Sequence, residues 1–314
     1  LIWKINKIEV FSEGLNNEKI LNFENNEQEL FSIIRYNELR NKLLVELKKK
    51  KFFNKKKKNF TKNLLKKKKF FNIKKKNVTE DLFKKKYNLI FNCESHNFIT
   101  KKFFSKQIKK DYKSFAHTAI IKHKRKEKEN KVAVQIFTLN GPIAFLPISE
   151  TETSVVYSTK NKKKIDLRKE IKRFNTQYKI LKITKPSFFQ LKLVNLRIYK
   201  YKNILAFGDL LHKIHPLAGQ GFNMNLRDLK EILSLIDLRI SNGLQLDSSI
   251  CKDFEKKTRH RNYLFSNGID LIYEIFNLES KLKKKIISRY IQILGKNKIL
   301  NNFFKSIADK GLRV

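Results

Sequence analysis

The sequence predicts a mixed α/β (α+β) fold, and three observations lead to this prediction. An apolar run at residues 204–207 is typical of a buried strand, and apolar residues at helical spacing follow it over residues 222–236. Residues 115–158 contain several alternating or apolar runs between turn residues, which indicates a sheet. After Asn242 and Gly243, a helix stop signal, the chain has helical periodicity almost to its end.

The other elements follow from the same patterns. Strands are expected in residues 5–10, at the start of residues 30–47, and in residues 87–94 and 188–199, and helices in the later part of 30–47 and in 165–178. Beyond residue 243 the expected helices span residues 248–276, 281–294 and 298–309. Residues 48–76 hold 16 lysines punctuated by aromatic and leucine residues, which favours short strands with solvated faces over a disordered basic tail.

The net charge of +42 raises the question of a nucleic-acid partner. However, 59 of the 71 basic residues are lysine and only 12 are arginine, whereas bidentate contacts to phosphates and contacts to base edges favour arginine. Lysines also occur in every segment, beside abundant Asn, Ile and Phe, so A/T-rich codon usage explains the excess. A nucleic-acid partner is therefore disfavoured, and a membrane surface is the stronger electrostatic alternative.

Other classes of protein are disfavoured by composition. Cys93 and Cys251 lie far apart and form no CxxC pair, which is typical of a reduced compartment. No apolar run is long enough for a membrane span. His212 and His215 are three residues apart, but without a third ligand they do not predict a metal site. No dedicated catalytic acid or base is assigned.

The turn after the strand at 204–207 suits a flat, polar cofactor. Asp209 follows the strand directly and can accept hydrogen bonds from sugar hydroxyls. Gly219 and Gly221 have no side chains to hold a ring system away. The first turn of the next helix presents N–H groups that favour negative charge.

This stretch resembles the second FAD-binding motif of the flavin-dependent aromatic hydroxylases, in particular the ubiquinone-biosynthesis branch. That branch carries the pattern Gly-Asp-Ala-Ala-His-x-x-His-Pro-x-Ala-Gly-Gln-Gly-x-Asn-x-Gly-x-x-Asp. The residues in agreement are Gly208, Asp209, His212, His215, Pro216, Ala218, Gly219, Gln220, Gly221, Asn223 and Asp228. The departures are Leu210, Leu211 and Asn225.

The resemblance implies a Rossmann-like, three-layer FAD/NAD(P)-binding domain with an inserted β-sheet substrate domain and C-terminal helices. It implies that FAD contacts Gly208, Asp209, His215, Pro216, Ala218, Gly219, Gln220, Gly221, Phe222 and Asn223. In the family, NAD(P)H reduces FAD, and O2 then forms a flavin C4a-hydroperoxide that hydroxylates a phenol ring. A polyprenylated phenol is the implied substrate, and other ubiquinone-biosynthesis proteins and a membrane surface are the implied partners.

Weaker similarities extend over most of the chain. Glu94 stands where the family has the acid of an Asp-Gly motif, although Ser95 replaces the glycine. Residues 141–147 resemble a segment of the sheet that covers the aromatic substrate. Arg35 and Arg40 lie close to the sequence position where the family has a phosphate-contacting arginine. Arg40 is included among the cofactor-binding candidates.

The family's first motif, Gly-x-Gly-x-x-Gly, has no counterpart among the nine glycines. With Leu1 in place of Met, this favours a truncated chain over a decayed gene. The expected domains are a partial FAD-binding domain at 1–110 that lacks its N-terminal βαβ unit and includes the lysine-rich segment 48–76, a substrate domain at 111–200, the second FAD motif with its helix at 201–247, and a helical region at 248–314.

Three hypotheses about function remain open at this point. The first is an FAD-dependent monooxygenase of ubiquinone biosynthesis, placed in the cytoplasm, or in the mitochondrial matrix of a eukaryote, and peripherally associated with the inner membrane. The second is a non-catalytic relative that acts as a subunit of the same assembly. The third is a basic nucleic-acid-binding protein, which rests on charge alone.

Overall fold

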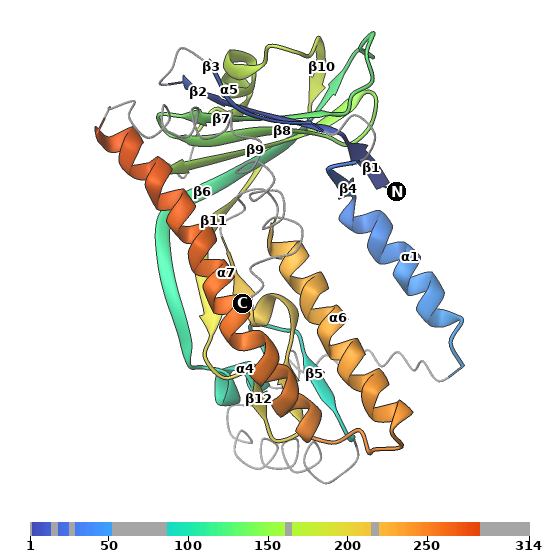
Figure 1. The fold of residues 1–314 in the computed structure, drawn as a ribbon. Coiled ribbons are helices and arrows are strands. Elements are labelled where there is room, and N and C mark those ends of the chain that lie inside the picture. The colour runs from blue at the N-terminus through green and yellow to red at the C-terminus, as the bar shows by residue number, and fades with distance from the viewer. Residues whose placement is uncertain are drawn as a thin grey trace, which may run out of the picture. The chain divides into compact units, whose positions relative to one another are not determined.

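The computed structural model describes residues 2–13, 18–24, 29–51, 87–160, 165–214 and 220–282 (Figure 1). The chain divides into two compact units. The first comprises Leu1–Phe53, Asp111–Leu191 and Leu271–Lys310, and the second comprises Asn54–Lys110, Lys192–Asp270 and Gly311–Val314. Each unit is described by itself below.

The first unit is built on a sheet in which most strands are antiparallel. Its strand order is β6 (Gln107–His123), β9 (Glu152–Lys160), β8 (Gly141–Pro147), β7 (Val132–Thr138), β2 (Lys7–Ser12) and β3 (Glu18–Glu24). Only β2 and β7 run parallel, with Lys7 opposite Val132. At the other edge of β6 lie β10 (Ile180–Ile183) and β11 (Ser187–Leu196).

A separate antiparallel pair, β1 (Ile2–Ile5) and β4 (Phe31–Ile34), leads into helix α1 (Tyr36–Lys48). No residue of α1 is buried. By contrast, α5 (Leu167–Phe174) packs on the large sheet through Leu167, Ile171 and Phe174. Asp166 caps α5 by accepting hydrogen bonds from the first free N–H groups of the helix.

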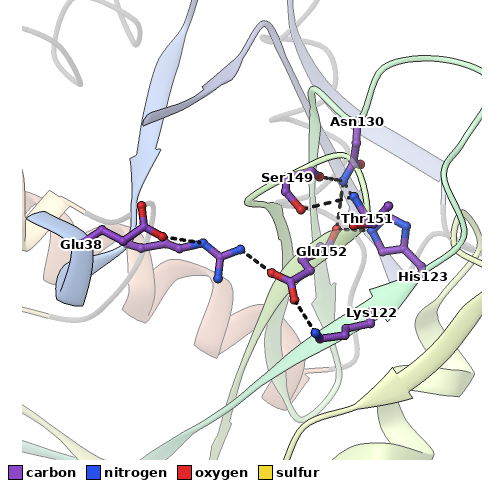
Figure 2. Close-up of polar contacts among 9 residues, drawn as sticks. Glu38, Lys122, His123, Asn130, Ser149, Thr151 and Glu152 are labelled. Atoms are coloured by element: carbon purple, nitrogen blue, oxygen red, sulfur yellow. Dashed lines mark hydrogen bonds and ion pairs between the residues drawn. The ribbon is translucent and has the colours of Figure 1, made fainter. Parts of the chain in front are cut away.

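Polar side chains are buried beside this core (Figure 2). His123, Asn130 and Thr153 are each at most 1% exposed. The Asn130 side-chain amide donates to the Ser149 carbonyl at 2.7 Å, and His123 Nε2 lies 3.0 Å from Thr153 Oγ1. These bonds satisfy groups that would otherwise be costly to bury, and they join β6 and β9 to the loops between them.

The second unit holds a three-stranded sheet in the order β12 (Lys200–Tyr201), β13 (Ile204–Ala206) and β5 (Ile90–Asn92). Its other elements are α4 (Phe98–Phe103), the 3₁₀ turn η2 (Gly208–Leu210), β14 (His212–Lys213), α6 (Gln220–Ser241) and α7 (Ser249–Leu282), whose last residues belong to the first unit. All three residues of β13 are buried in the core of this unit, together with apolar residues of α6 and α7.

Most predicted elements are present in the described residues, and several differ in extent. The strand expected at 5–10 is β2, at Lys7–Ser12, and the helix expected at 165–178 is the shorter α5. The strand expected at 87–94 is confined to β5, and the chain then bends at residues 95–97 into α4. The strand expected from residue 115 begins earlier, at Gln107. The helix expected to end at residue 276 continues as α7 to Leu282. Gly243 has φ +64°, as expected of a residue that ends a helix. Residues 52–86, with most of the lysine-rich segment, and residues 283–314 lie outside the described residues.

The two cysteines provide a test of how helix α7 packs in the second unit. Cys251 is fully buried, and burial raises the pKa of its thiol to about 11, whereas Cys93 is exposed. Partial desolvation and the Glu94 carboxylate raise the pKa of Cys93 as well, but its thiol is exposed, so Cys93 should react faster with a disulfide reagent at pH 8 than the inaccessible Cys251. Cys93→Ser should remove the fast phase. Rapid reaction at Cys251 of the folded protein would contradict the packing of α7.

Candidate functional site

The candidate site lies at one edge of the second unit's sheet. Strands β5 and β13 are parallel, with Ile204 opposite Ile90 and Ala206 opposite Asn92. The backbone N–H of Phe207 donates to the Asn92 carbonyl at 3.0 Å, so the pairing continues to the last residue of β5. Because parallel strands end at the same edge, the segments after Asn92 and Ala206 emerge side by side, where open α/β sheets bind ligands.

The segment after β5 is held by its own side chains. Asn97 caps α4 by accepting from the Thr100 N–H at 2.8 Å, and its side-chain amide donates to Asn92 Oδ1 at 2.6 Å. The Thr100 hydroxyl donates to the Glu94 carbonyl and accepts from the Asn92 amide. The backbone around Glu94 is therefore fixed, while its carboxylate is exposed to solvent at the sheet edge.

The segment after β13 begins with Gly208, whose φ of +66° is one that residues with a side chain rarely adopt. A Cβ built on Gly208 would meet nothing within 4 Å, so backbone conformation, not crowding, explains the glycine. Asp209 is exposed, and its Oδ1 accepts a 2.9 Å hydrogen bond from Asn225 Nδ2 on α6. This bond fixes the carboxylate and leaves Oδ2 free of hydrogen bonds within the described residues.

Helix α6 begins at Gln220 and brings further polar groups to the same segment. Gln220 Oε1 and Asn225 Oδ1 are buried and have no hydrogen-bond donor among the described residues. Gly221 lies against Ile214, whose side chain would stand 3.7 Å from an added Cβ, an ordinary contact. Phe222 and Asn223 are exposed, and Asn223 is the fourth residue of the helix, so it does not cap it.

A buried ionisable pair holds the motif to the core. His212 on β14 and Asp228 on α6 are nearly inaccessible, and His212 Nε2 lies 2.8 Å from Asp228 Oδ2. Asn262 on α7 donates to both carboxylate oxygens, at 2.9 and 3.1 Å. One carboxylate therefore links β14, α6 and α7, and the polar partners offset the cost of burying it.

The predicted cofactor residues divide into three groups. Gly208, Asp209, Gln220, Gly221, Phe222, Asn223 and Glu94 lie in the second unit, at the sheet edge or on the first turn of α6. His215, Pro216, Ala218 and Gly219 lie outside the described residues. Arg40 is exposed on α1 in the first unit, and its role stays a prediction. Arg35, the other candidate, pairs instead with Glu152 and Glu38.

Three residues that depart from the family pattern have structural roles that the sequence did not indicate. Leu210 and Leu211, at positions of family alanines, are almost completely buried in the second unit's core. Asn225, at a position of a family glycine, holds Asp209. The helical spacing of Asn225 and Asp228 on α6 was a visible signal for the polar contacts, but their partners on other elements were not.

No protein-family model matches the chain. Among curated proteins, it is 22% identical over 230 residues to the ubiquinone biosynthesis monooxygenase COQ6, mitochondrial, of Schizosaccharomyces pombe, covering 58% of this chain and 48% of that protein. It is 28% identical over 153 residues to the 3-demethoxyubiquinol 3-hydroxylase of Escherichia coli, covering 46% of this chain and 39% of that protein. The chain thus spans about half the length of the curated relatives it matches, or less.

Solved structures show the same fold. The p-nitrophenol 4-monooxygenase PnpA of Pseudomonas putida has a TM-score of 0.70 at 9% identity, covering 100% of this chain and 84% of that chain. HpxO of Klebsiella pneumoniae, complexed with FAD and uric acid, has a TM-score of 0.57 at 10% identity, covering 70% of this chain and 60% of that chain. The predicted fold class is confirmed, and so is the resemblance to the ubiquinone-biosynthesis monooxygenases.

The buried pair yields a stability prediction. Asp228→Ala leaves His212 and Asn262 without their shared acceptor, so we expect it to lower the free energy of unfolding by roughly 3–5 kcal/mol. Asp237→Ala removes the same charge from an exposed position on α6 and should change it by less than about 0.5 kcal/mol. Urea unfolding at neutral pH measures both. Equal losses for the two variants would show that the network contributes nothing specific.

Proposed function

We propose that the protein is an FAD-dependent monooxygenase that hydroxylates a polyprenylated phenol ring in ubiquinone biosynthesis, with O2 and NAD(P)H as cosubstrates. The observation that carries the proposal is the parallel pairing of β5 and β13, which brings two segments resembling FAD motifs to one sheet edge. Both curated relatives bear names of ubiquinone-pathway oxygenation enzymes, which supports this substrate class.

The polar groups at the edge fit the sugar-alcohol chain of FAD. Asp209 presents a carboxylate oxygen to solvent, and Gln220 and Asn225 each hold a buried oxygen without a donor among the described residues. All three are acceptors, and the ribityl hydroxyls are donors, so the sets are complementary. Gly208 leaves open space beside Asp209. Bound FAD would supply the electron transfer and the activation of oxygen.

The remaining cofactor residues have assigned roles in this proposal. The resemblance implies that residues 216–221 would line the flavin ring and that His215 would contact the cofactor. The first turn of α6 would face the edge of the ring that becomes negative on reduction, and its N–H groups would stabilise that charge. Glu94 would contact the nucleotide half of FAD, and Arg40 stays a candidate phosphate contact on the resemblance alone.

The first unit offers a surface for the aromatic substrate. Gln135 and Phe137 on β7 stand opposite Ala144 and Pro142 on β8. These four residues alternate with the buried ones that face α5, so they share the other face of the sheet, where they are only partly buried. We propose that this face covers the phenol ring, as the resemblance of residues 141–147 implies.

The second unit has an open sheet edge and an exposed apolar stripe among its described residues. Within the described residues β5 has a partner on one side only, and α6 exposes an apolar stripe of Phe222, Leu226, Leu229 and Leu233, each more than 40% exposed. Parallel sheets are usually covered on both faces. A strand–Gly-rich turn–helix unit of the kind that the resembled family carries would pair with β5 and cover this stripe.

A non-catalytic subunit of the ubiquinone-synthesis assembly is the second candidate, favoured by Ser95 and by the exposed stripe of α6. It shares with the enzyme the expected association with other pathway proteins. If the source is eukaryotic, the mitochondrial matrix is the proposed location, because the fission-yeast relative is named as mitochondrial.

Flavin-fluorescence titration tests the proposal, at salt high enough to screen the charge of +42. We expect saturable FAD binding that Asp209→Ala weakens roughly tenfold or more, because a hydrogen-bonded charged acceptor is lost. Asp237→Ala, with the same charge change, should bind as the unaltered chain does.

The outcomes separate the candidates. Binding that depends on Asp209 supports the monooxygenase. No binding by a folded chain would favour the non-catalytic subunit, and saturable retention on DNA at the same salt, unaffected by FAD, would favour a nucleic-acid binder.

A further inference from the structure

An exposed, apolar and basic segment forms one border of the first unit's sheet. Residues 181–190, which span most of β10 and the start of β11, are largely exposed. Leu181, Phe188 and Phe189 are 63%, 48% and 51% exposed, although large apolar side chains are usually buried in cores. Lys182 and Lys185 lie between them and are also exposed. We call residues 181–189 the border segment.

The border segment is held firmly to β6. The Thr184 backbone N–H donates to the Ile120 carbonyl at 2.9 Å, and the Ile120 N–H donates to Thr184 Oγ1 at the same distance. The hydroxyls of Ser187 and Thr118 are 2.7 Å apart. The Phe188 ring also contacts the Phe115 ring edge-on, with centroids 6.4 Å apart. The aromatic side chains are thus presented from a fixed backbone.

The charged residues in and around the border segment of the sequence are all basic. From Ile171 to Gly208 the sequence has nine basic residues and no aspartate or glutamate. The described acid that contacts this strand is Asp111, which accepts a hydrogen bond from Gln190 at 2.9 Å, beyond the border segment. Exposed aromatic side chains beside lysines, here without an ion pair among the described residues, are the composition of surfaces that lie on anionic bilayers.

Strand geometry favours a lipid surface over an added protein strand. Consecutive strand residues point to opposite faces, so Phe188 and Phe189 both reach a bilayer only when the strand edge itself faces it. Pro186 has no N–H to donate, and the lysines at this edge oppose pairing with another strand. The border segment therefore suits a headgroup region better than β-strand addition.

We propose that the border segment docks the first unit edge-on against an anionic membrane, with Phe188, Phe189 and Leu181 inserted among the headgroups and Lys182 and Lys185 on lipid phosphates. The proposal rests on the proposed function in one respect, because a polyprenylated substrate resides in a bilayer. Docking would bring the substrate-covering sheet to the membrane surface.

Sedimentation with phosphatidylcholine vesicles, with and without phosphatidylglycerol, tests this proposal. Phe188→Ser together with Phe189→Ser should weaken binding to the anionic vesicles roughly tenfold or more, through the loss of buried apolar surface. The matched control is Tyr36→Ser with Leu43→Ser, which removes two exposed apolar side chains from α1. We expect the control to bind as the unaltered chain does.

A second pair of variants separates local from general electrostatic attraction. Lys182→Gln with Lys185→Gln should weaken binding roughly tenfold at low salt. Lys169→Gln with Lys172→Gln removes the same charge from exposed positions on α5 and should have little effect. Equal losses in both pairs would overturn the proposal, since attraction would then follow net charge alone.

Insertion is read directly with Phe189→Trp in a Trp3→Phe background. Brominated lipid in anionic vesicles should quench the fluorescence of this tryptophan. If the protein sediments with the vesicles but its fluorescence is not quenched, the proposal is wrong. If the border variants instead abolish self-association on a sizing column and leave vesicle binding intact, the segment is an interface between copies and the proposal is wrong. Vesicle binding without any FAD binding would refute the proposed function and leave the docking surface standing.

Discussion

The parallel pairing of β5 with β13 is the constraint on which the candidate site depends. Each strand is only three residues long, yet their register ends both at the same edge. The segments that follow are 114 residues apart in sequence, from Asn92 to Ala206, and resemble two separate cofactor motifs. If the strands were antiparallel, these segments would leave from opposite edges and share no ligand.

Apolar residues buried in the core of the second unit hold β13 and the turn that follows it in place. Ile204, Leu205 and Ala206 are essentially inaccessible, and Leu210 and Leu211 fill the core where the family has alanines. The motif tolerates these two leucines because their side chains are buried in the core. Behind the motif, Asp228 joins three elements through His212 and Asn262, so the orientation of α6 relative to β14 is specified by polar contacts as well as by apolar burial.

Local sequence predicted those features that depend on neighbours in the chain. The strand at 204–206, the start of α6 and the stop at Gly243 all follow from apolar periodicity and glycine chemistry. Long-range pairing was not predictable in the same way: nothing local shows that β2 lies beside β7, or that Asn225 holds Asp209. The continuation of α7 beyond residue 276 was also missed, because the mostly polar residues 277–281 interrupt the apolar spacing, although no Asn-Gly stop signal occurs there. None of the helices in the described residues is both long and apolar enough to cross a bilayer.

Hydrogen exchange of backbone amides with and without FAD tests the shared edge most directly. The account predicts that FAD slows exchange in both segments 93–97 and 207–211, and that Asp209→Ala removes the protection in both together. Because the β5–β13 pairing brings both segments to one edge, a ligand bound at that edge should protect them together. Protection of one segment alone, or only of the lysine-rich residues 48–76, would contradict the claim that this edge is the cofactor site.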